Sequence, residues 1–296
     1  MSAHRCGTVS FVGRPNTGKS SLLNRLVGQK LSIVSHKAQT TRHLVTGILT
    51  TDDCQYVFVD SPGYQTRHAG GLNRTLNRRA SDAARDTSVV CFVVEAGRFG
   101  EPDREALARI PLEQPTIAVV NKLDKVPQRD VLLPFVEKLA AERDFLAIVP
   151  VSARTGRNVD ELLKVLREAL PESPPAYGPD QLTDRDERFF AAEMVREKLF
   201  LALGEELPYR CEVSIESFKE EGRLRRIEAT IWVDRPSQKS IVIGDKGAGL
   251  KRIGTAARKE LEALFGGKVY LGLWVKVREG WTDDERALRQ FGHSGG

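Results

Sequence analysis

Four residues near the start of the chain have the types and spacing needed to hold a polyphosphate. Gly13 is followed, after four residues, by Gly18, Lys19 and Ser20. Glycines let backbone N–H groups approach phosphate oxygens, the lysine can reach the β- and γ-phosphates, and the serine hydroxyl can ligate Mg²⁺. A strand-like run precedes this loop and a helical pattern follows it, so a helix N-terminus would add partial positive charge. The sequence therefore predicts a nucleoside triphosphate site formed by Gly13, Arg14, Pro15, Asn16, Thr17, Gly18, Lys19 and Ser20.

A second polar turn, Asp60-Ser61-Pro62-Gly63, follows another apolar strand. An aspartate at the carboxyl end of such a strand can hold Mg²⁺, directly or through water, and the Gly63 N–H can meet the γ-phosphate. Asp-x-x-Gly alone is usually a simple turn. Because it follows the phosphate loop along the chain, we expect Asp60, Ser61, Pro62 and Gly63 to complete the phosphate and metal end of the same site.

The segment Asn121-Lys122-Leu123-Asp124 has the residue types needed to recognise guanine. The Asp124 carboxylate can accept two N–H donors from the Watson–Crick edge of guanine, and adenine presents no such pair, so the wrong base would lose a matched pair of buried hydrogen bonds. Asn121 would brace the loop, and the stem of Lys122 would pack on the base. A backbone N–H of a later turn would reach the guanine O6, and that turn is formed by Ser152, Ala153 and Arg154.

Composition limits the class of protein. The chain has 296 residues, 41% of them apolar and 29% charged, which indicates a soluble globular protein with two domains of ordinary size. No apolar run approaches the ~20 residues that span a bilayer. The N-terminus lacks the apolar core of a secretory leader. The four cysteines are scattered, as expected of reduced, mostly buried thiols. We therefore expect a cytoplasmic location.

The first part of the chain alternates strand and helix, which predicts an α/β domain with a mostly parallel sheet and helices on both faces. A turn within Ile48–Asp60 predicts a hairpin. The expected strands are Thr8–Val12, Gln55–Asp60, Ser88–Glu95, Thr116–Asn121 and Ala147–Ser152, and the expected helices include Arg104–Arg109, Leu132–Arg143 and Val159–Ala169.

A proline-rich stretch, Pro171–Pro179, interrupts this alternation with four prolines in nine residues. We expect an extended, semi-rigid linker, because proline continues neither a helix nor a central strand. We accordingly place one domain at 1–172, the linker at 173–183 and a second domain at 184–296. The second domain has the order α-β-β-α-β, from Arg188–Leu203, Cys211–Phe218, Arg226–Asp234, Leu250–Phe265 and Val269–Val277.

A glycine-rich loop opens the second helix of this domain. In the loop Gly244-Asp245-Lys246-Gly247, glycines would let a nucleic acid backbone approach closely and Lys246 would add charge. The loop lies within Arg235–Arg278, which holds ten basic and three acidic residues. Such a basic zone suits an anionic partner such as RNA, although it also suits a solvated surface. The residues expected to bind RNA are Gly244, Asp245, Lys246, Gly247, Lys251 and Arg252.

These motifs together resemble a known family. The first ~170 residues look like a small GTPase domain. Gly-Arg-Pro-Asn in the first loop and the segment Gln39-Thr40-Thr41-Arg42-His43 resemble the Era-like bacterial ribosome-assembly GTPases. The Gly-x-x-Gly loop in its setting is similar to a type II KH domain, and Arg188–Tyr209 and Trp274–Arg278 also resemble the C-terminal domain of that family.

The resemblance implies a GTP-hydrolysing switch, with GTP and GDP as ligands, that binds near the 3′ end of small-subunit ribosomal RNA and assists assembly of the small subunit. It implies that a threonine joins the Mg²⁺ shell, and we favour Thr41 over Thr40. Lys19, Thr41 and Gly63 would serve catalysis, and Asn16 matches a position at which relatives bind K⁺. Tyr64 follows Gly63 where Ras-like proteins carry the glutamine that orients water, so we expect slow intrinsic hydrolysis; the neighbouring Gln65 would face elsewhere.

Alternatives remain for the C-terminal domain. It could dock a protein partner, or contact anionic lipid on the cytoplasmic face of the inner membrane, because a basic zone suits lipid headgroups as well as RNA. A role in RNA modification lacks support, since no Cys or His cluster occurs there. We expect a monomer. Trp281, Phe291 and the terminal Gly295 and Gly296 are expected to be peripheral, in a frayed terminus.

Overall fold

The computed structural model describes residues 4–35, 37, 40–64, 71–126, 129–204 and 207–292, with only the backbone at 129–131. Gln39, Gln65, Gly295 and Gly296, all named above, lie outside these residues. The chain forms two compact units. The first comprises Met1–Ser32, Thr41–His68 and Leu76–Asp184, and the second comprises Ile33–Thr40, Ala69–Thr75 and Arg185–Gly296. Each unit is described separately below.

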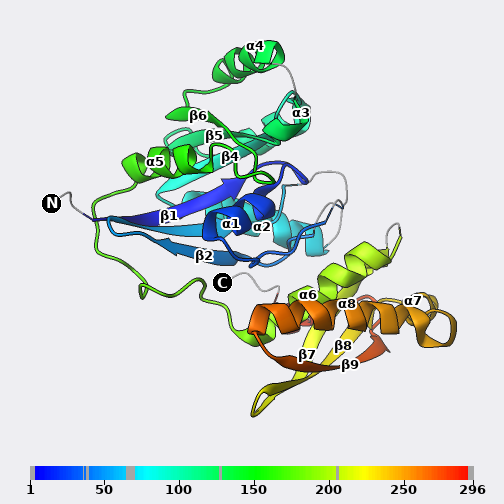
Figure 1. The fold of residues 1–296 in the computed structure, drawn as a ribbon. Helices are drawn as coiled ribbons and strands as arrows, with labels where there is room; N and C mark the ends of the chain where they lie inside the picture. Colours follow the sequence, from blue (N-terminus) through cyan, green and yellow to red (C-terminus); the bar gives the residue numbers. More distant parts are fainter. Residues whose placement is uncertain are drawn as a thin grey trace. The chain divides into compact units, whose positions relative to one another are not determined.

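The first unit contains a six-stranded sheet in the order β2-β3-β1-β4-β5-β6 (Figure 1). The edge strand β2 runs antiparallel to β3, and the other neighbours are parallel. This is the mostly parallel sheet that the sequence predicts, and the expected hairpin is confirmed. The strands are β1 (Arg5–Val12), β2 (Val45–Thr50), β3 (Cys54–Asp60), β4 (Val89–Glu95), β5 (Thr116–Asn121) and β6 (Ala147–Pro150).

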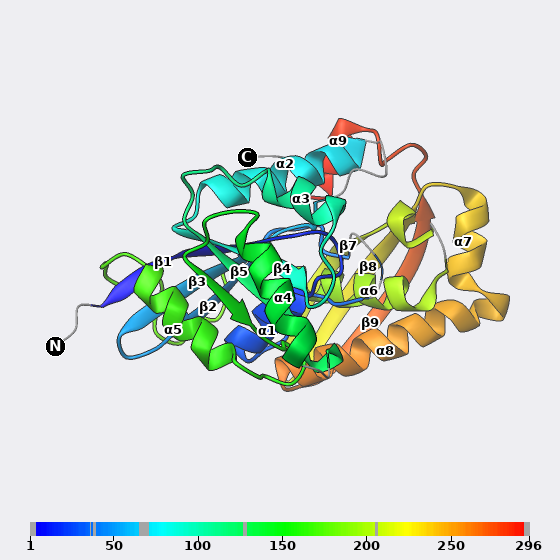
Figure 2. The same cartoon turned by 90° about the horizontal axis from the view of Figure 1, so that it is seen from above.

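Helices cover both faces of this sheet. On one face Ala84, Leu107 and Leu139, from three different helices, pack against Phe92 and Val120 of the central strands. The helices α1 and α5 lie against strands on the other face (Figure 2). Central strands buried on both faces explain the unbroken apolar runs of β4 and β5. The helices are α1 (Lys19–Val27), α2 (Gly71–Arg85), α3 (Glu101–Leu107), α4 (Arg129–Ala140) and α5 (Val159–Ala169).

Parallel strands bring their carboxyl ends to one edge of the sheet, where ligands of open α/β folds bind. Three of the predicted motifs begin at these ends. The phosphate loop follows Val12 of β1, the Asp-x-x-Gly turn begins at Asp60 of β3, and the guanine motif begins at Asn121 of β5. The topology therefore gathers into one place residues that lie up to about a hundred positions apart in the chain.

Residues 171–183, which include the proline-rich stretch, contain a turn in which the Gln181 N–H donates to the Gly178 carbonyl at 3.2 Å, and they are hydrogen-bonded to the first unit. The Pro171 carbonyl accepts the Cys6 N–H at 3.2 Å, and the Leu182 carbonyl accepts the N–H of Ile48 in β2 at 2.8 Å. The Thr183 hydroxyl donates to the Thr46 carbonyl at 2.7 Å. The segment from 171 to 183 is thus anchored at both ends by backbone contacts to strands of the sheet.

The second unit is a three-stranded sheet with helices on one face (Figure 1). β7 and β8 are antiparallel and β8 and β9 are parallel. Val195 of α6 and Ile253 of α8 pack against Ile231 of β8 in one buried cluster. The elements are α6 (Glu187–Ala202), β7 (Cys211–Glu221), β8 (Leu224–Val233), α7 (Pro236–Ile243), α8 (Ala248–Phe265), β9 (Lys268–Val277) and α9 (Glu285–Gln290).

The structure differs from the sequence-based expectation in two places in this unit. The helix α7 lies before the glycine-rich loop, so the order is α-β-β-α-α-β followed by α9. The expectation of a frayed, peripheral end is wrong for Trp281 and Phe291. Trp281 is fully buried, and its ring meets Phe291 edge to face with centroids 5.4 Å apart. Its indole N–H donates to the Arg210 carbonyl at 3.2 Å.

The cysteines and the helix lengths bear on two general expectations from the sequence. All four cysteines, which are Cys6, Cys54, Cys91 and Cys211, are buried and unpaired, as expected. Within the part of the chain that the structure describes, no helix combines the length and the apolar character required to cross a membrane.

Candidate functional site

The lysine of the phosphate loop is buried within the loop itself. The Lys19 ammonium donates to the carbonyls of Gly13 and Arg14 at 2.9 and 3.0 Å, at the start of α1. Burial lowers the pKa of Lys19 to about 8, Asp60 acts to raise it, and Arg14 lowers it further. A phosphate beside this ammonium would favour its charged form. The loop is therefore built to gain from an anion at this point.

Three oxygen-bearing side chains gather beside the lysine. The hydroxyls of Ser20 and Thr41 lie 2.8 Å apart. Asp60 is fully buried; its Oδ2 accepts the Ser32 hydroxyl at 2.7 Å, while its Oδ1 accepts no hydrogen bond from the residues that the structure describes. Burial raises the pKa of Asp60, and the hydroxyls of Ser20, Ser32 and Thr41 lower it. An unsatisfied buried carboxylate oxygen next to two hydroxyls is a donor set that fits Mg²⁺.

Thr40, the other candidate threonine, is engaged elsewhere. Its hydroxyl lies 2.5 Å from the Ser35 hydroxyl and donates to the Lys37 carbonyl at 2.8 Å. Of the two threonines, Thr41 is the one whose hydroxyl contacts Ser20. This geometry agrees with the preference for Thr41, which the sequence alone supported only weakly.

Gly63 lies against the phosphate loop. A Cβ atom on Gly63 would lie 3.0 Å from the Pro15 Cα and 3.1 Å from the Lys19 ammonium. A side chain at this position would therefore press on the Pro15 backbone and the Lys19 ammonium, and glycine avoids this contact. The preceding Ser61 is fixed by donating its hydroxyl to the Phe11 carbonyl at 2.9 Å. The Asp-x-x-Gly turn thus reaches the loop as the sequence predicts.

Asn121 joins the guanine motif to the phosphate loop. Its side-chain amide donates to the Thr17 carbonyl at 2.9 Å and accepts the Ala153 N–H at 3.0 Å. The Lys122 ammonium donates to the Asn16 carbonyl at 2.5 Å. One asparagine therefore connects three of the segments singled out in the sequence, in the bracing position expected of it.

The carboxylate of Asp124 is oriented by two residues of the turn Ser152–Arg154. Its Oδ1 accepts the Ser152 hydroxyl at 2.5 Å, and its Oδ2 pairs with the Arg154 guanidinium at 2.7 Å. The Ser152 hydrogen bond is the main cause that lowers the pKa of Asp124; burial opposes it and Arg154 adds to it. The group stays ionised at neutral pH, as an acceptor of two N–H donors must be.

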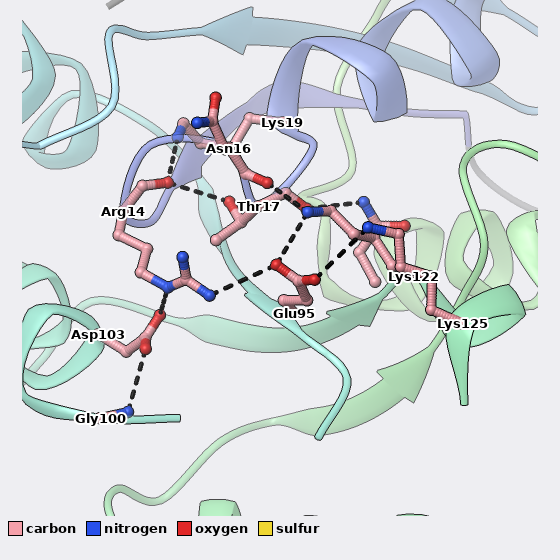
Figure 3. Close-up of polar contacts among 10 residues, drawn as sticks. Arg14, Asn16, Thr17, Lys19, Glu95, Gly100, Asp103, Lys122 and Lys125 are labelled. Carbon is pink, nitrogen blue, oxygen red and sulfur yellow. Dashed lines mark hydrogen bonds and ion pairs between the residues drawn. The ribbon is translucent and has the colours of Figure 1, made fainter. Parts of the chain in front are cut away.

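Two acidic residues next to these motifs, Glu95 and Asp103, were not predicted to belong to the site from the sequence. Glu95, at the end of β4, lies 2.9 Å from the Lys122 ammonium and 3.5 Å from the Arg14 guanidinium. Asp103 accepts the Arg14 Nε–H at 2.9 Å, as Figure 3 shows. The signal for Glu95 was available, because it ends a predicted strand next in register to Asn121. The signal for Asp103 was not, since nothing in sequence joins it to Arg14.

The Gly-x-x-Gly loop lies in the second unit, between α7 and α8. Gly244, Lys246 and Gly247 all have positive φ, and the Gly247 N–H closes a turn by donating to the Gly244 carbonyl at 3.2 Å. Beside the loop, the first turns of α8 line a hollow of about 490 Å³. Its walls are formed by Ala248, Lys251, Arg252, Thr255, Ala256 and Lys259. Lys251 and Arg252, two of the cations predicted to bind RNA, therefore share one surface next to the loop.

Comparison with known proteins identifies both units. A family model described as 50S ribosome-binding GTPase matches residues 8–122, and a KH domain model matches residues 206–282. GTPase Era of Nitrosomonas eutropha is 52% identical over 99% of each chain. GTPase Era of Chromobacterium violaceum is 53% identical over 97% of each chain.

Solved structures agree with this assignment. A single-substitution variant of Aquifex aeolicus Era bound to GDP.AlF4⁻ aligns with a TM-score of 0.94 at 38% identity, over 98% of this chain and all of that one. Era in complex with MgGDPNP and nucleotides 1506–1542 of 16S ribosomal RNA aligns with the same TM-score and identity, over 99% of this chain and 100% of that one. The α/β GTPase fold followed by a KH domain is confirmed, and the chain belongs to the GTPase Era family.

Proposed function

We propose that the protein is a GTP-driven switch that binds ribosomal RNA through its KH domain and assists assembly of the small ribosomal subunit. The observation that carries the nucleotide half is the double hydrogen bond of Asn121, which ties the phosphate loop at Thr17 to the guanine turn at Ala153. A site built in this way binds both ends of GTP at once. The related Era complex with MgGDPNP and 16S ribosomal RNA supports the RNA half.

We assign the nucleotide contacts to the residues that the motifs single out. Lys19 and the Gly63 N–H would stabilise negative charge on the phosphates as the terminal bond breaks. The side-chain hydroxyl and carboxylate oxygens of Ser20, Thr41 and Asp60 would hold Mg²⁺, which when bound neutralises charge on the β- and γ-phosphate oxygens. Asp124 would read the guanine edge, while Lys122 would pack on the base. The backbone of Arg14, Pro15 and Asn16 and the turn Ser152–Arg154 would complete the shell.

Intrinsic hydrolysis should be slow, on the order of 10⁻⁴ to 10⁻² s⁻¹. Tyr64 is partly buried against the sheet core, and the Arg109 guanidinium stacks 4.6 Å from its ring centroid. A phenol held in this way cannot orient water as a carboxamide would. A fast basal rate that Gln65→Ala abolishes would contradict this view.

K⁺ at Asn16 belongs to the same proposal, and equal hydrolysis rates in Na⁺ and K⁺ buffers would count against it.

The central test measures nucleotide and RNA binding together in the full chain. The protein should bind GTP and hydrolyse it, leave ATP untouched, and bind a transcript of nucleotides 1506–1542 of 16S ribosomal RNA with an affinity that depends on the nucleotide. A transcript of the same length and shuffled sequence is the control. Gly247→Asp places an anion in the loop and should weaken RNA binding while leaving GTP binding intact. Equal affinity for both transcripts would overturn the proposed target.

The same experiment covers the alternative partners. Binding to vesicles of anionic phospholipid that survives in Gly247→Asp, while RNA binding is absent from the native protein, would favour membrane docking over RNA. We expect a cytoplasmic monomer, to be checked by light scattering. We also retain the division into a GTPase domain at 1–172, a linker at 173–183 and a KH domain at 184–296. The change of contact unit after Asp184 supports the last boundary.

A further inference from the structure

Glu95 lies where two nucleotide-binding segments meet, and no motif of the site includes it. It ends β4 and neighbours Asn121 of β5 in register. Its residue surface is 8% exposed, so it is a nearly buried carboxylate. Buried carboxylates are costly unless cations pair with them. Three cations surround this one, and they come from both nucleotide-binding segments.

The pairing has a definite geometry (Figure 3). One carboxylate oxygen, Oε2, lies 2.9 Å from the Lys122 ammonium and 3.5 Å from the Arg14 guanidinium. The other, Oε1, lies 3.7 Å from the Lys125 ammonium. Burial acts to raise the pKa of Glu95, but Lys122, Lys125 and Arg14 together hold it below its usual range. The carboxylate is therefore charged at neutral pH and shared between the two segments.

Arg14 is fixed from a second side. Its Nε–H donates to Asp103 Oδ1 at 2.9 Å, while Asp103 Oδ2 accepts the Gly100 N–H at 3.1 Å at the start of α3. The Arg14 side chain is thus held by carboxylates from β4 and α3, and its carbonyl meanwhile accepts the Lys19 ammonium. The side chain of Arg14 is therefore fixed from two sides, while its backbone forms part of the phosphate loop.

We propose that Glu95 is a positioning residue for nucleotide binding, which links the phosphate loop through Arg14 to the guanine loop through Lys122. Lys122 then lies between the guanine base that it should cover and the Glu95 carboxylate. Arg14, which pairs with the same carboxylate, keeps the phosphate loop aligned with Lys122. The link makes the two ends of the nucleotide site interdependent. This inference rests on the proposed GTP site.

The link should affect binding more than chemistry. Glu95 contacts none of Lys19, Thr41 or Gly63 in the described residues, so the groups that would stabilise the transition state keep their places. Interactions that hold ground state and transition state equally change KM and leave kcat unchanged. A residue whose role is only structural would instead lower the thermal midpoint without a selective effect on nucleotide affinity.

The test uses Glu95→Gln in the full chain, with Glu142→Gln as the matched control. Glu142 also pairs with an arginine, Arg104, at 2.7 Å in the same unit, and within the described part of the chain no contact joins it to a predicted site residue. We expect Glu95→Gln to raise the Kd of both GTP and GDP about tenfold with kcat within about twofold. Glu142→Gln should leave both constants unchanged. Unchanged nucleotide Kd in Glu95→Gln, or a loss confined to kcat, would overturn the inference.

A double-mutant cycle identifies the partner. Arg14→Gln, Glu95→Gln and the double variant are compared by GDP affinity, and the double variant should bind about as well as the weaker single variant, because either change breaks the same link. Strictly additive losses would refute the link, and Arg14→Lys should restore part of the affinity. If Glu95→Gln does not fold, the GDP affinity of Arg14→Gln is compared with that of Arg104→Gln as the control. Weaker GDP binding in Arg14→Gln alone would support the link, and unchanged binding would refute it. Absence of GTP binding by the native chain would instead refute the proposed function.

Discussion

The hydroxyls of Ser20 and Thr41 lie 2.8 Å apart, beside the unsatisfied Oδ1 of Asp60. Thr41→Ala should lower kcat for GTP hydrolysis about 100-fold, because a preorganised group near the developing charge is lost. It should also raise the Mg²⁺ concentration needed for the half-maximal rate, because a Mg²⁺ ligand is lost. Thr40→Ala is the control, since its hydroxyl bonds Ser35 and the Lys37 carbonyl. A larger effect of Thr40→Ala in steady-state assays would reverse the assignment.

Asp124→Asn should change the base that the site accepts. The amide presents one donor and one acceptor where guanine needs two acceptors, so the Kd of GTP should rise about 10³-fold. Xanthosine triphosphate, whose base carries a carbonyl in place of the amino group, should become the better ligand. Competition against a fluorescent nucleotide measures both. Asp53→Asn breaks the contact of Asp53 with Arg167, away from the site, and should change neither affinity. Retained preference for GTP in Asp124→Asn would contradict the role of this carboxylate.

Lys19 should make nucleotide binding depend on pH. Its folded-state pKa is about 8, below the ordinary 10.5, because burial disfavours the charged form. Without nucleotide, the unfolded state therefore binds more protons between these values, and the free energy of unfolding gains a contribution as pH rises from about 8 to 10.5. Phosphate binding requires the charged form, so GDP affinity should fall about tenfold per pH unit above pH 8.

Calorimetry in buffers of different ionisation enthalpy should detect proton uptake on GDP binding near pH 8. Lys19→Arg, whose charge does not titrate in this range, should bind more weakly and show no such pH dependence. A native affinity that is flat up to pH 10 would show that Lys19 stays charged in the free protein.

Trp281→Ala should be among the most destabilising substitutions in the KH domain. The side chain is fully buried against Phe291 and donates to the Arg210 carbonyl. Removing such an aromatic costs about 3–5 kcal/mol. Trp274, with 47% of its surface exposed, is the matched tryptophan, and its replacement by alanine should cost about 1 kcal/mol or less. Equal midpoints for the two variants in urea, followed by circular dichroism, would contradict this.

The two glycines of the KH loop should differ in their tolerance of alanine. Gly244 has φ 69° and ψ −179°, a region that is essentially restricted to glycine, and a Cβ there would lie 2.8 Å from the Gly249 nitrogen. Gly247 has φ 84° and ψ 5°, and no atom of the described residues lies within 4 Å of the position that a Cβ would take. Gly244→Ala should therefore weaken RNA binding more than Gly247→Ala, as measured by titration of labelled transcript. The opposite order would mean that side-chain bulk at Gly247, not loop shape, limits RNA approach.

The nucleotide site was predictable because each of its motifs carries its own chemistry and sits at the end of an apolar strand. Lys19, Asp60 and Asn121 lie far apart in sequence, but parallel strands bring the segments that carry them to one edge of the sheet. Predicting the role of Glu95 requires knowledge of how its strand pairs with its neighbours. Its charge was visible in the sequence, but Arg14 becomes its neighbour only through the pairing of β4 with β1, and Lys122 only through the pairing of β4 with β5.

The missed parts of the KH domain have different causes. The helix α7 is only eight residues long, too short for a clear apolar period. Pro236 at its first turn and Gln238, which accepts the Arg235 N–H at 3.0 Å, were its available start signals. Trp281 lies in a polar stretch, and its burial depends on residues such as Arg210, some seventy positions away. Local sequence could not reveal that contact.

Residues 171–183 cover part of the edge of the first sheet as well as joining the domains. β2 is an edge strand, and an open edge offers unpaired N–H and C=O groups to any extended chain. Leu182 and Thr183 occupy part of that edge through Ile48 and Thr46. A chain cut at Glu172 would keep every nucleotide-binding residue and still expose β2. We expect this truncated chain to self-associate by strand pairing at the β2 edge. It should lose solubility before it loses GTP binding.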